Sequence, residues 1–162
     1  MRTDEAVERD EDRQIVTTRV IDGPRRLVYE AWTAPHHLER WFGPHGFSIT
    51  THAFEFRPGG VWEFDMHGPD GTTYPNRVEW REIVPGERIV YWQGSHADDP
   101  DAFETTVTFA DRDGGTEITL RSLFKTKAQR DYVVEHFRAD EGGRQTLERL
   151  GAYVAELASV GG

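Results

Sequence analysis

Four turn signals divide the middle of the chain into short runs, and this spacing limits the fold more than any other feature. The signals combine proline, glycine and aspartate, which favour tight turns. The runs between them are rich in strand-forming residues, so the stretch from Phe47 to Phe124 is predicted to be an antiparallel meander. The signals are Pro58-Gly59-Gly60, Pro69-Asp70-Gly71, Pro85-Gly86-Glu87 and Asp113-Gly114-Gly115.

Apolar and polar residues alternate within these runs. Because an extended chain points successive side chains to opposite faces, one face of the sheet is predicted to be wet and the other to cover an apolar layer. An earlier strand is predicted over residues 14–21, which read QIVTTRVI. The inward set comprises Trp62, Phe64 and Met66 in one run, Phe103, Val107 and Phe109 in another, and Ile118, Leu120 and Phe124 in a third.

Two short helices are predicted between the first strand and the meander. Pro24, after the turn at Asp22-Gly23, is well placed to open the first helix. The second helix has Thr33 as its expected N-cap and ends before Gly43-Pro44. We expect its apolar side to cap the interior, and this side comprises Leu38, Trp41 and Phe42.

A long C-terminal helix, from Thr126 to near Leu157, is predicted to cover the apolar face of the sheet. Thr126 and Gln129 form a Thr-x-x-Gln capping box. Gly142 and Gly143 interrupt the helical pattern, where each costs about 1 kcal/mol relative to alanine. Since Gly143 falls on the sheet-facing side, three explanations stay open: a close approach to the sheet, a bend or break, or side-chain volume withheld to leave a hollow.

The composition indicates one domain with a charged surface. With 162 residues, 36% of them hydrophobic and 12% aromatic, the chain can bury a substantial core. We predict a disordered tail over residues 1–12, a single domain over residues 13–158 and a flexible C-terminus over residues 159–162. No apolar run suits a signal peptide or a membrane span, so a cytoplasmic protein is expected.

The formal net charge of −10 argues against a nucleic-acid partner. Phosphate binding relies on Lys and Arg, and 19 basic residues face 29 acidic ones. Binding to anionic membranes is disfavoured for the same reason. The lack of cysteine excludes disulfides, thiolate metal sites and cysteine nucleophiles.

The seven histidines are the main candidates for chemistry, and most are expected at the surface. No HExxH motif is present, and the adjacent His36 and His37 point about 100° apart on a helix, so no metal site is predicted. His136 lies on the sheet-facing side of the long helix, where it could contact a ligand, or be a hydrogen-bonded or half-exposed core residue. Other polar candidates for the mouth of a hollow are Tyr74, Arg77, Glu104 and Arg144.

Five segments follow one another in an order that is specific at the level of a family. They are AWTAPHHLERWFGP, FEFRPGGVWEFDMHGPDGTTYP, WREIVPGERIVYW, TVTFADRDGGTEITL and VVEHFRADEGGRQTLERLGAYV. The series resembles the activator of heat-shock-protein-90 ATPase homologue family of the START-like (SRPBCC) superfamily, from about Arg13 to Leu157. The resemblance implies an α+β helix-grip fold, in which a curved antiparallel sheet grips the C-terminal helix and two short N-terminal helices close one side of a hydrophobic cavity.

The resemblance implies that the chain binds a small, mostly hydrophobic molecule, since superfamily relatives bind lipids, sterols, polyketides or plant hormones. It implies no cofactor and no assigned reaction. One alternative is a cyclase-like or hydrolytic enzyme with His136, Tyr74 or Glu104 transferring protons, and another is a protein-interaction or stress-response module. Homodimers are compatible with the superfamily. Co-chaperone activity is not expected, because the eukaryotic namesake uses an additional N-terminal domain for which this chain has no room.

The predicted site is a cavity between the sheet and the C-terminal helix. Inward-facing aromatic side chains would line it, although any one of them could instead simply fill the core. No catalytic and no metal-binding residue is assigned. The predicted lining comprises Trp41, Phe42, Trp62, Phe64, Met66, Trp80, Tyr91, Phe103, Phe124, Tyr132, His136 and Gly143.

Overall fold

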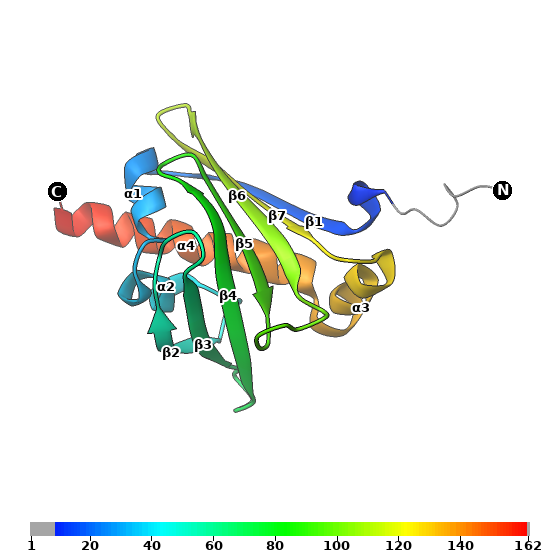
Figure 1. Cartoon of the computed structure of the whole chain (residues 1–162). Helices are drawn as coiled ribbons and strands as arrows, with labels where there is room; N and C mark the ends of the chain where they lie inside the picture. The colour runs from blue at the N-terminus through cyan, green and yellow to red at the C-terminus, as the bar shows by residue number, and fades with distance from the viewer. Residues whose placement is uncertain (1–8, 162) are drawn as a thin grey trace.

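A curved antiparallel sheet wraps around a long C-terminal helix in the computed structural model (Figure 1), which describes residues 9–161. The predicted tail lies outside the described residues at positions 1–8, as does position 162. None of the helices within the described range is long and apolar enough to cross a membrane. The strands are β1 (Gln14–Ile21), β2 (Ser48–Phe54), β3 (Val61–His67), β4 (Thr73–Val84), β5 (Arg88–Gly94), β6 (Phe103–Arg112) and β7 (Gly115–Leu123).

The strand order is β1-β7-β6-β5-β4-β3-β2, so five successive hairpins form the predicted meander. Each of the four turn signals joins two consecutive strands and contains a glycine with a positive φ angle, which other residues rarely adopt. Strand β1 joins from the other end of the sequence by pairing with β7, with Gln14 opposite Leu123 and Ile21 opposite Thr116. The meander and the first strand are confirmed.

Helices α1 (Arg25–Glu30) and α2 (Pro35–Trp41) follow β1, as predicted, but the expected N-cap of α2 is wrong. Ala34 is the N-cap, because Pro35 occupies the first helical position. The Thr33 hydroxyl instead donates to the Glu30 carbonyl at 2.8 Å, at the end of α1. Short 3-10 helix η1 (Asp10–Asp12) precedes β1.

The C-terminal segment forms two helices, α3 (Lys127–Phe137) and α4 (Ala139–Gly161), so the prediction of one helix ending near Leu157 is wrong. The break lies at Arg138, whose backbone is left-handed (φ 51°, ψ 47°), and not at Gly142 or Gly143. The capping box is half formed. Thr126 accepts from the Gln129 amide at 3.0 Å, whereas the Gln129 side chain accepts from Lys125 and not from Thr126.

Gly143 lies where α4 packs closely against strand β1. A Cβ atom at this position would sit 2.8 Å from Thr17 Oγ1 on β1. No side chain larger than hydrogen fits such an approach without displacement of its neighbour. The close approach is therefore the explanation for Gly143, while the change of chain direction is supplied by Arg138.

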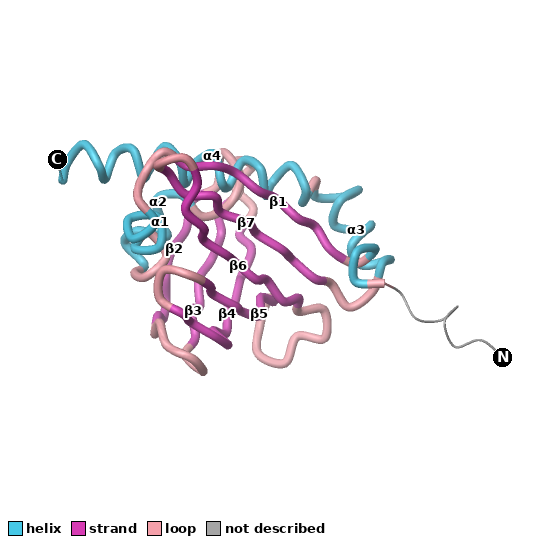
Figure 2. The backbone as a smooth tube through the Cα atoms, turned by 90° about the horizontal axis from the view of Figure 1, so that it is seen from above, coloured by secondary structure: helices cyan, strands magenta, loops and turns pink. Residues whose placement is uncertain are grey.

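The core is densely aromatic at the end of α4 near α1 and α2. Helix α3 lies at the opposite end of α4 (Figures 1 and 2). Trp32 meets Trp41 edge to face with ring centroids 4.8 Å apart, and Trp62 stacks on Phe64 at 3.8 Å. Buried residues of α4, including Leu147, Leu150 and Val154, join this cluster. The arrangement is the helix-grip architecture expected from the resemblance.

Side chains of α4 fasten α2 and the loop after it. The Arg149 guanidinium donates to the carbonyl oxygens of Gly43 and Pro44, each at 2.9 Å, and its partial burial lowers its pKa. The His37 Nδ1 atom lies 2.6 Å from the Tyr153 hydroxyl. Burial, with a smaller effect of the neighbouring His36, lowers the pKa of His37, so the folded state favours the neutral imidazole.

Replacement of Gly143 by alanine should lower the free energy of unfolding by about 1–3 kcal/mol, because the methyl group would overpack the contact with Thr17. A methyl group at Gly151 of the same helix would have its nearest neighbour, Arg19 Nε, at 3.7 Å, which is an ordinary contact. Gly151→Ala should therefore raise stability by up to about 1 kcal/mol. Urea unfolding measures both changes. A penalty at position 143 that persists in a Thr17→Ala background would contradict the close approach.

The lowered pKa of His37 makes stability depend on pH. The folded state favours the neutral ring, so the contribution of His37 is complete above the unfolded-state pKa of about 6.5 and is lost as pH falls through the lower folded-state pKa. NMR titration should find the His37 imidazole below its ordinary pKa, and His36→Gln should raise that pKa. Urea unfolding of His37→Gln should show a weaker loss of stability below pH 6.5 than the parent protein. An unshifted His37 titration would refute this assignment.

Candidate functional site

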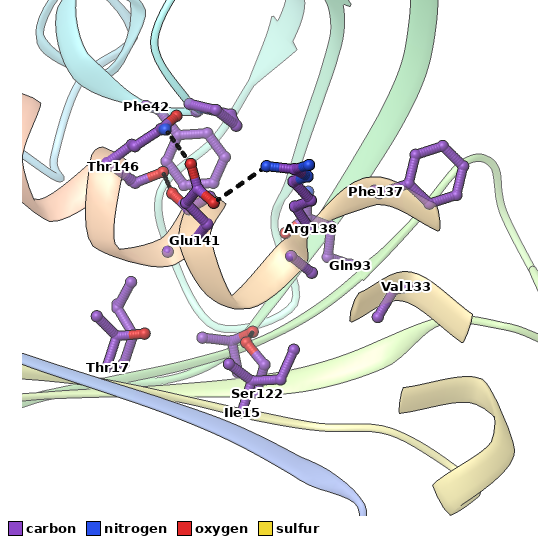
Figure 3. Close-up of a pocket in the computed structure, with 18 of the residues that line it drawn as sticks. Ile15, Thr17, Phe42, Gln93, Ser122, Val133, Phe137, Arg138, Glu141 and Thr146 are labelled. Atoms are coloured by element: carbon purple, nitrogen blue, oxygen red, sulfur yellow. Dashed lines mark hydrogen bonds and ion pairs between the residues drawn. The ribbon is translucent and has the colours of Figure 1, made fainter. Parts of the chain in front are cut away.

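A cavity of about 610 Å³ lies between the concave face of the sheet, α3 and the beginning of α4 (Figure 3). Residues of β1, β3, β4, β5, β6 and β7 form its floor, and the loop between α2 and β2 closes one side. Apolar side chains supply most of its wall: Ile15, Phe42, Phe47, Met66, Phe103, Leu120, Phe124, Val133 and Phe137.

The cavity lies beside the break between α3 and α4. Gly142, Gly143 and Ala139 line it from α4 and present little side-chain volume to the space below, although Glu141, Gln145 and Thr146 also line it from this part of the helix. In Figure 3, Ile15, Thr17 and Ser122 lie on the strands beneath the helix. Two of the three explanations for the glycines therefore apply together, the close approach and the hollow. Gly143 approaches Thr17 at the border of the cavity.

Uncharged polar groups interrupt the apolar floor. Thr105 and Ser122, from β6 and β7, are joined by a hydrogen bond of 3.0 Å between their hydroxyl oxygens. Gln93 donates from Nε2 to Asn76 Oδ1 at 3.0 Å. Tyr91 is buried opposite Thr105, and this burial raises the pKa of the phenol well above its usual range. Tyr91 therefore keeps its proton at any physiological pH.

Charged groups lie at the rim and face one another. Arg138 and Glu141 approach to 3.7 Å across the first turn of α4, as Figure 3 shows. The His45 ring forms an ion pair with Glu148 when it is protonated, and the Gln145 side chain accepts from the His45 amide at 3.1 Å. These contacts tie the loop after α2 to α4 at the edge of the cavity.

Six of the residues predicted to line the cavity do so. These residues come from six separate segments, and the curvature of the sheet brings them together. Ligand contact by these residues stays a prediction. They are Phe42, Met66, Tyr91, Phe103, Phe124 and Gly143.

Four predicted lining residues are buried away from the cavity: Trp41, Trp62, Phe64 and Trp80. They belong to the aromatic cluster at the other end of the interior, where Phe42 meets Trp62 at 5.1 Å and marks the boundary. These four rings therefore fill the core and do not line the cavity, which is the alternative given for them in the sequence. Strand alternation identifies the inward face but not the position along it, so the two groups look alike in the sequence.

The prediction that Tyr132 and His136 face the sheet is wrong. Tyr132 is 53% exposed, and the ring of the exposed His136 lies tilted against it with ring centroids 4.3 Å apart. The break at Arg138 turns α3 relative to α4, so a helical period extended across both segments assigns the wrong face to residues of α3. Val133 and Phe137 of α3 line the cavity instead.

Among the polar candidates for the mouth, only Tyr74 lines the cavity. Arg77 lies on the outer face of β4, 3.6 Å from Glu63, and Arg144 lies 3.9 Å from Asp140 on α4. Glu104 is also outside the lining. Within residues 9–161, no three His, Asp or Glu side chains converge as a metal site would require.

Sequence reasoning missed the polar floor, although the strands carry a signal for it. Thr105 occupies an inward position between Phe103 and Val107, and Ser122 does so between Leu120 and Phe124. A polar residue at the inward phase of an apolar strand needs a partner or a wet space. Asn76 and Gln93 fit the same rule on β4 and β5.

Solved structures with the same fold cover nearly the whole chain. A protein from Nitrosomonas europaea has a TM-score of 0.83 at 23% identity, covering 93% of this chain and 99% of its own. One from Arthrobacter aurescens has a TM-score of 0.82 at 25% identity, covering 93% and 90%. One from Chromobacterium violaceum has a TM-score of 0.73 at 26% identity, covering 86% and 95%.

The family assignment comes from the sequence. No curated protein matches the chain. The family described as Activator of Hsp90 ATPase homolog 1-like protein matches residues 22–155, from the end of β1 to the last turns of α4. This range includes both short helices, the whole meander and most of the cavity lining. The chain therefore belongs to the Activator of Hsp90 ATPase homolog 1-like family, with a START-like helix-grip fold.

Proposed function

We propose that this protein binds a small, mostly hydrophobic molecule in the cavity between the sheet, α3 and α4. The observation that carries the proposal is the cavity itself, about 610 Å³ with a mainly apolar wall and a few converging polar groups. Pockets for small molecules have about 300–1,000 Å³ and this same mixture of surfaces. The START-like fold commonly binds hydrophobic ligands, which agrees with the proposal.

The distribution of aromatic residues supports a cavity that serves binding. The chain packs four of its five tryptophans tightly at one end of the interior, with Trp32, Trp41, Trp62 and Trp80 all fully buried. At the other end, small residues of α4 face the apolar floor of the sheet and the volume between them stays open. Displacement of water from this uncovered apolar wall by an apolar ligand makes the free energy of binding more favourable.

The ligand enters the cavity beside helix α3. No residue of α3, which lies wholly within the described range, is fully buried, and Phe137 at its end is 60% exposed while it lines the cavity. A helix with so little buried surface separates from its neighbours at low cost. We therefore place ligand entry between α3 and the loop after α2, with Phe42, Met66, Tyr91, Phe103, Phe124 and Gly143 contacting the bound molecule.

The fluorescent probe N-phenyl-1-naphthylamine tests the proposal directly, because it is neutral and brightens in apolar surroundings. Its emission should rise on addition of the protein and saturate. Ala139→Phe should weaken probe binding at least about tenfold, since it places a ring in the space that the probe would occupy. Ala152→Phe is the matched control on the exposed side of α4 and should leave binding unchanged.

Native mass spectrometry of the gently purified protein should also show a co-purified small molecule. Loss of that adduct in Ala139→Phe, with retention in Ala152→Phe, would locate it in the cavity. Absence of probe binding by a correctly folded parent protein, or equal binding by both variants, would refute the proposed function.

A further inference from the structure

We infer that the cavity selects an uncharged ligand whose apolar body carries a hydroxyl, carbonyl or amide group, and discriminates against a carboxylate or ammonium group at that position. The inference rests on the proposed function and specifies the chemical class of the ligand. It is carried by the uncharged polar groups on the floor of the cavity and by the pairing of the charged groups at its rim.

The polar floor runs across four neighbouring strands. Asn76 on β4, Gln93 on β5, Thr105 on β6 and Ser122 on β7 all line the cavity, and the register places Thr105 opposite both Tyr91 and Ser122. None of these side chains carries a charge near neutral pH. Thr105 is 2% exposed, so its hydroxyl is held in a fixed position by its neighbours.

The floor offers both a hydrogen-bond acceptor and donors. Gln93 uses one Nε2 hydrogen for Asn76, and its Oε1 atom accepts no hydrogen bond from residues 9–161. Thr105 and Ser122 share one hydrogen bond between their two hydroxyl groups, so one of the two hydroxyl protons stays available. A ligand hydroxyl can donate to Gln93 and accept from this hydroxyl pair, whereas a carbonyl can only accept.

The charged residues of the lining are compensated at the rim. Among the residues that the structure describes, the basic and acidic members of the lining are His45, Arg138 and Glu141. Arg138 and Glu141 face each other at 3.7 Å, and His45 faces Glu148. The floor therefore lacks a countercharge for an ionised ligand group, and a carboxylate placed there would lose its hydration without an ion pair in return.

A matched pair of competitors tests the inference: decanol below its solubility limit and decanoate below its micelle concentration, each displacing N-phenyl-1-naphthylamine at pH 8. The two molecules share one alkyl chain and differ at the head group. Decanol should compete at least about tenfold more strongly than decanoate, because only its neutral head can exchange water for the floor groups without an unpaired charge.

Removal of a hydroxyl group from the floor of the cavity tests whether the floor causes the preference for the uncharged head group. Thr105→Val should weaken competition by decanol about three- to tenfold and leave decanoate nearly unchanged, since the variant keeps the shape of the side chain and removes its hydrogen bonds. Thr119→Val, on the outer face of β7 where Thr119 bonds to Thr18, is the matched control and should alter neither. Ser122→Ala provides a second variant at the same hydrogen bond if Thr105→Val does not fold.

The outcomes separate the two proposals. If the probe binds and decanoate competes as well as decanol, the selection for an uncharged ligand is overturned while the proposed function stands. The same conclusion follows if Thr105→Val and Ser122→Ala both leave decanol competition unchanged. If the probe does not bind the folded parent protein, the proposed function fails and the selection fails with it.

Discussion

The contact between α4 and β1 is the constraint on which the rest of the structure depends. Gly143 brings the helix so close to Thr17 that a methyl group would not fit between them, and beyond this point Leu147, Leu150 and Val154 are completely buried. The helix axis is thereby held against one edge of a sheet that curves around it. Once this edge is set, the free volume between the helix and the middle of the sheet is decided by side chains alone.

Those side chains divide the interior into two unlike parts. Toward α1 and α2, tryptophan and phenylalanine rings meet one another at short distances. Arg149 and Tyr153 hold α2 and the loop after it in place. Toward α3, glycine and alanine on α4 leave a hollow above a floor with neutral hydrogen-bonding groups. A rigid, packed half that supports an open half is an arrangement suited to ligand binding, because it limits the reorganisation that binding requires.

Much of the fold could be predicted from local patterns, and the reasons are visible in particular residues. Glycines with positive φ angles mark the turns, alternation marks the inward faces of β3, β6 and β7, and Thr126 caps the helix that it precedes. The cavity was harder to predict in detail. Six lining residues were identified, but four tryptophan and phenylalanine residues on the same face belong to the packed half, and Tyr132 and His136 lie outside because the helix breaks at Arg138.

The sequence by itself determined the strands, the turns, the order of the elements and the membership of the family, because each depends on short-range periodicity, on turn chemistry or on an ordered series of motifs. Only the tertiary structure decided where the interior stays open, which polar side chains meet at its floor and which charges neutralise each other at its rim. Most of these contacts join residues distant in the chain, such as Thr17 with Gly143, Thr105 with Ser122, and His45 with Glu148. Their distances are set by the curvature of the sheet and the placement of α4, which no local pattern encodes.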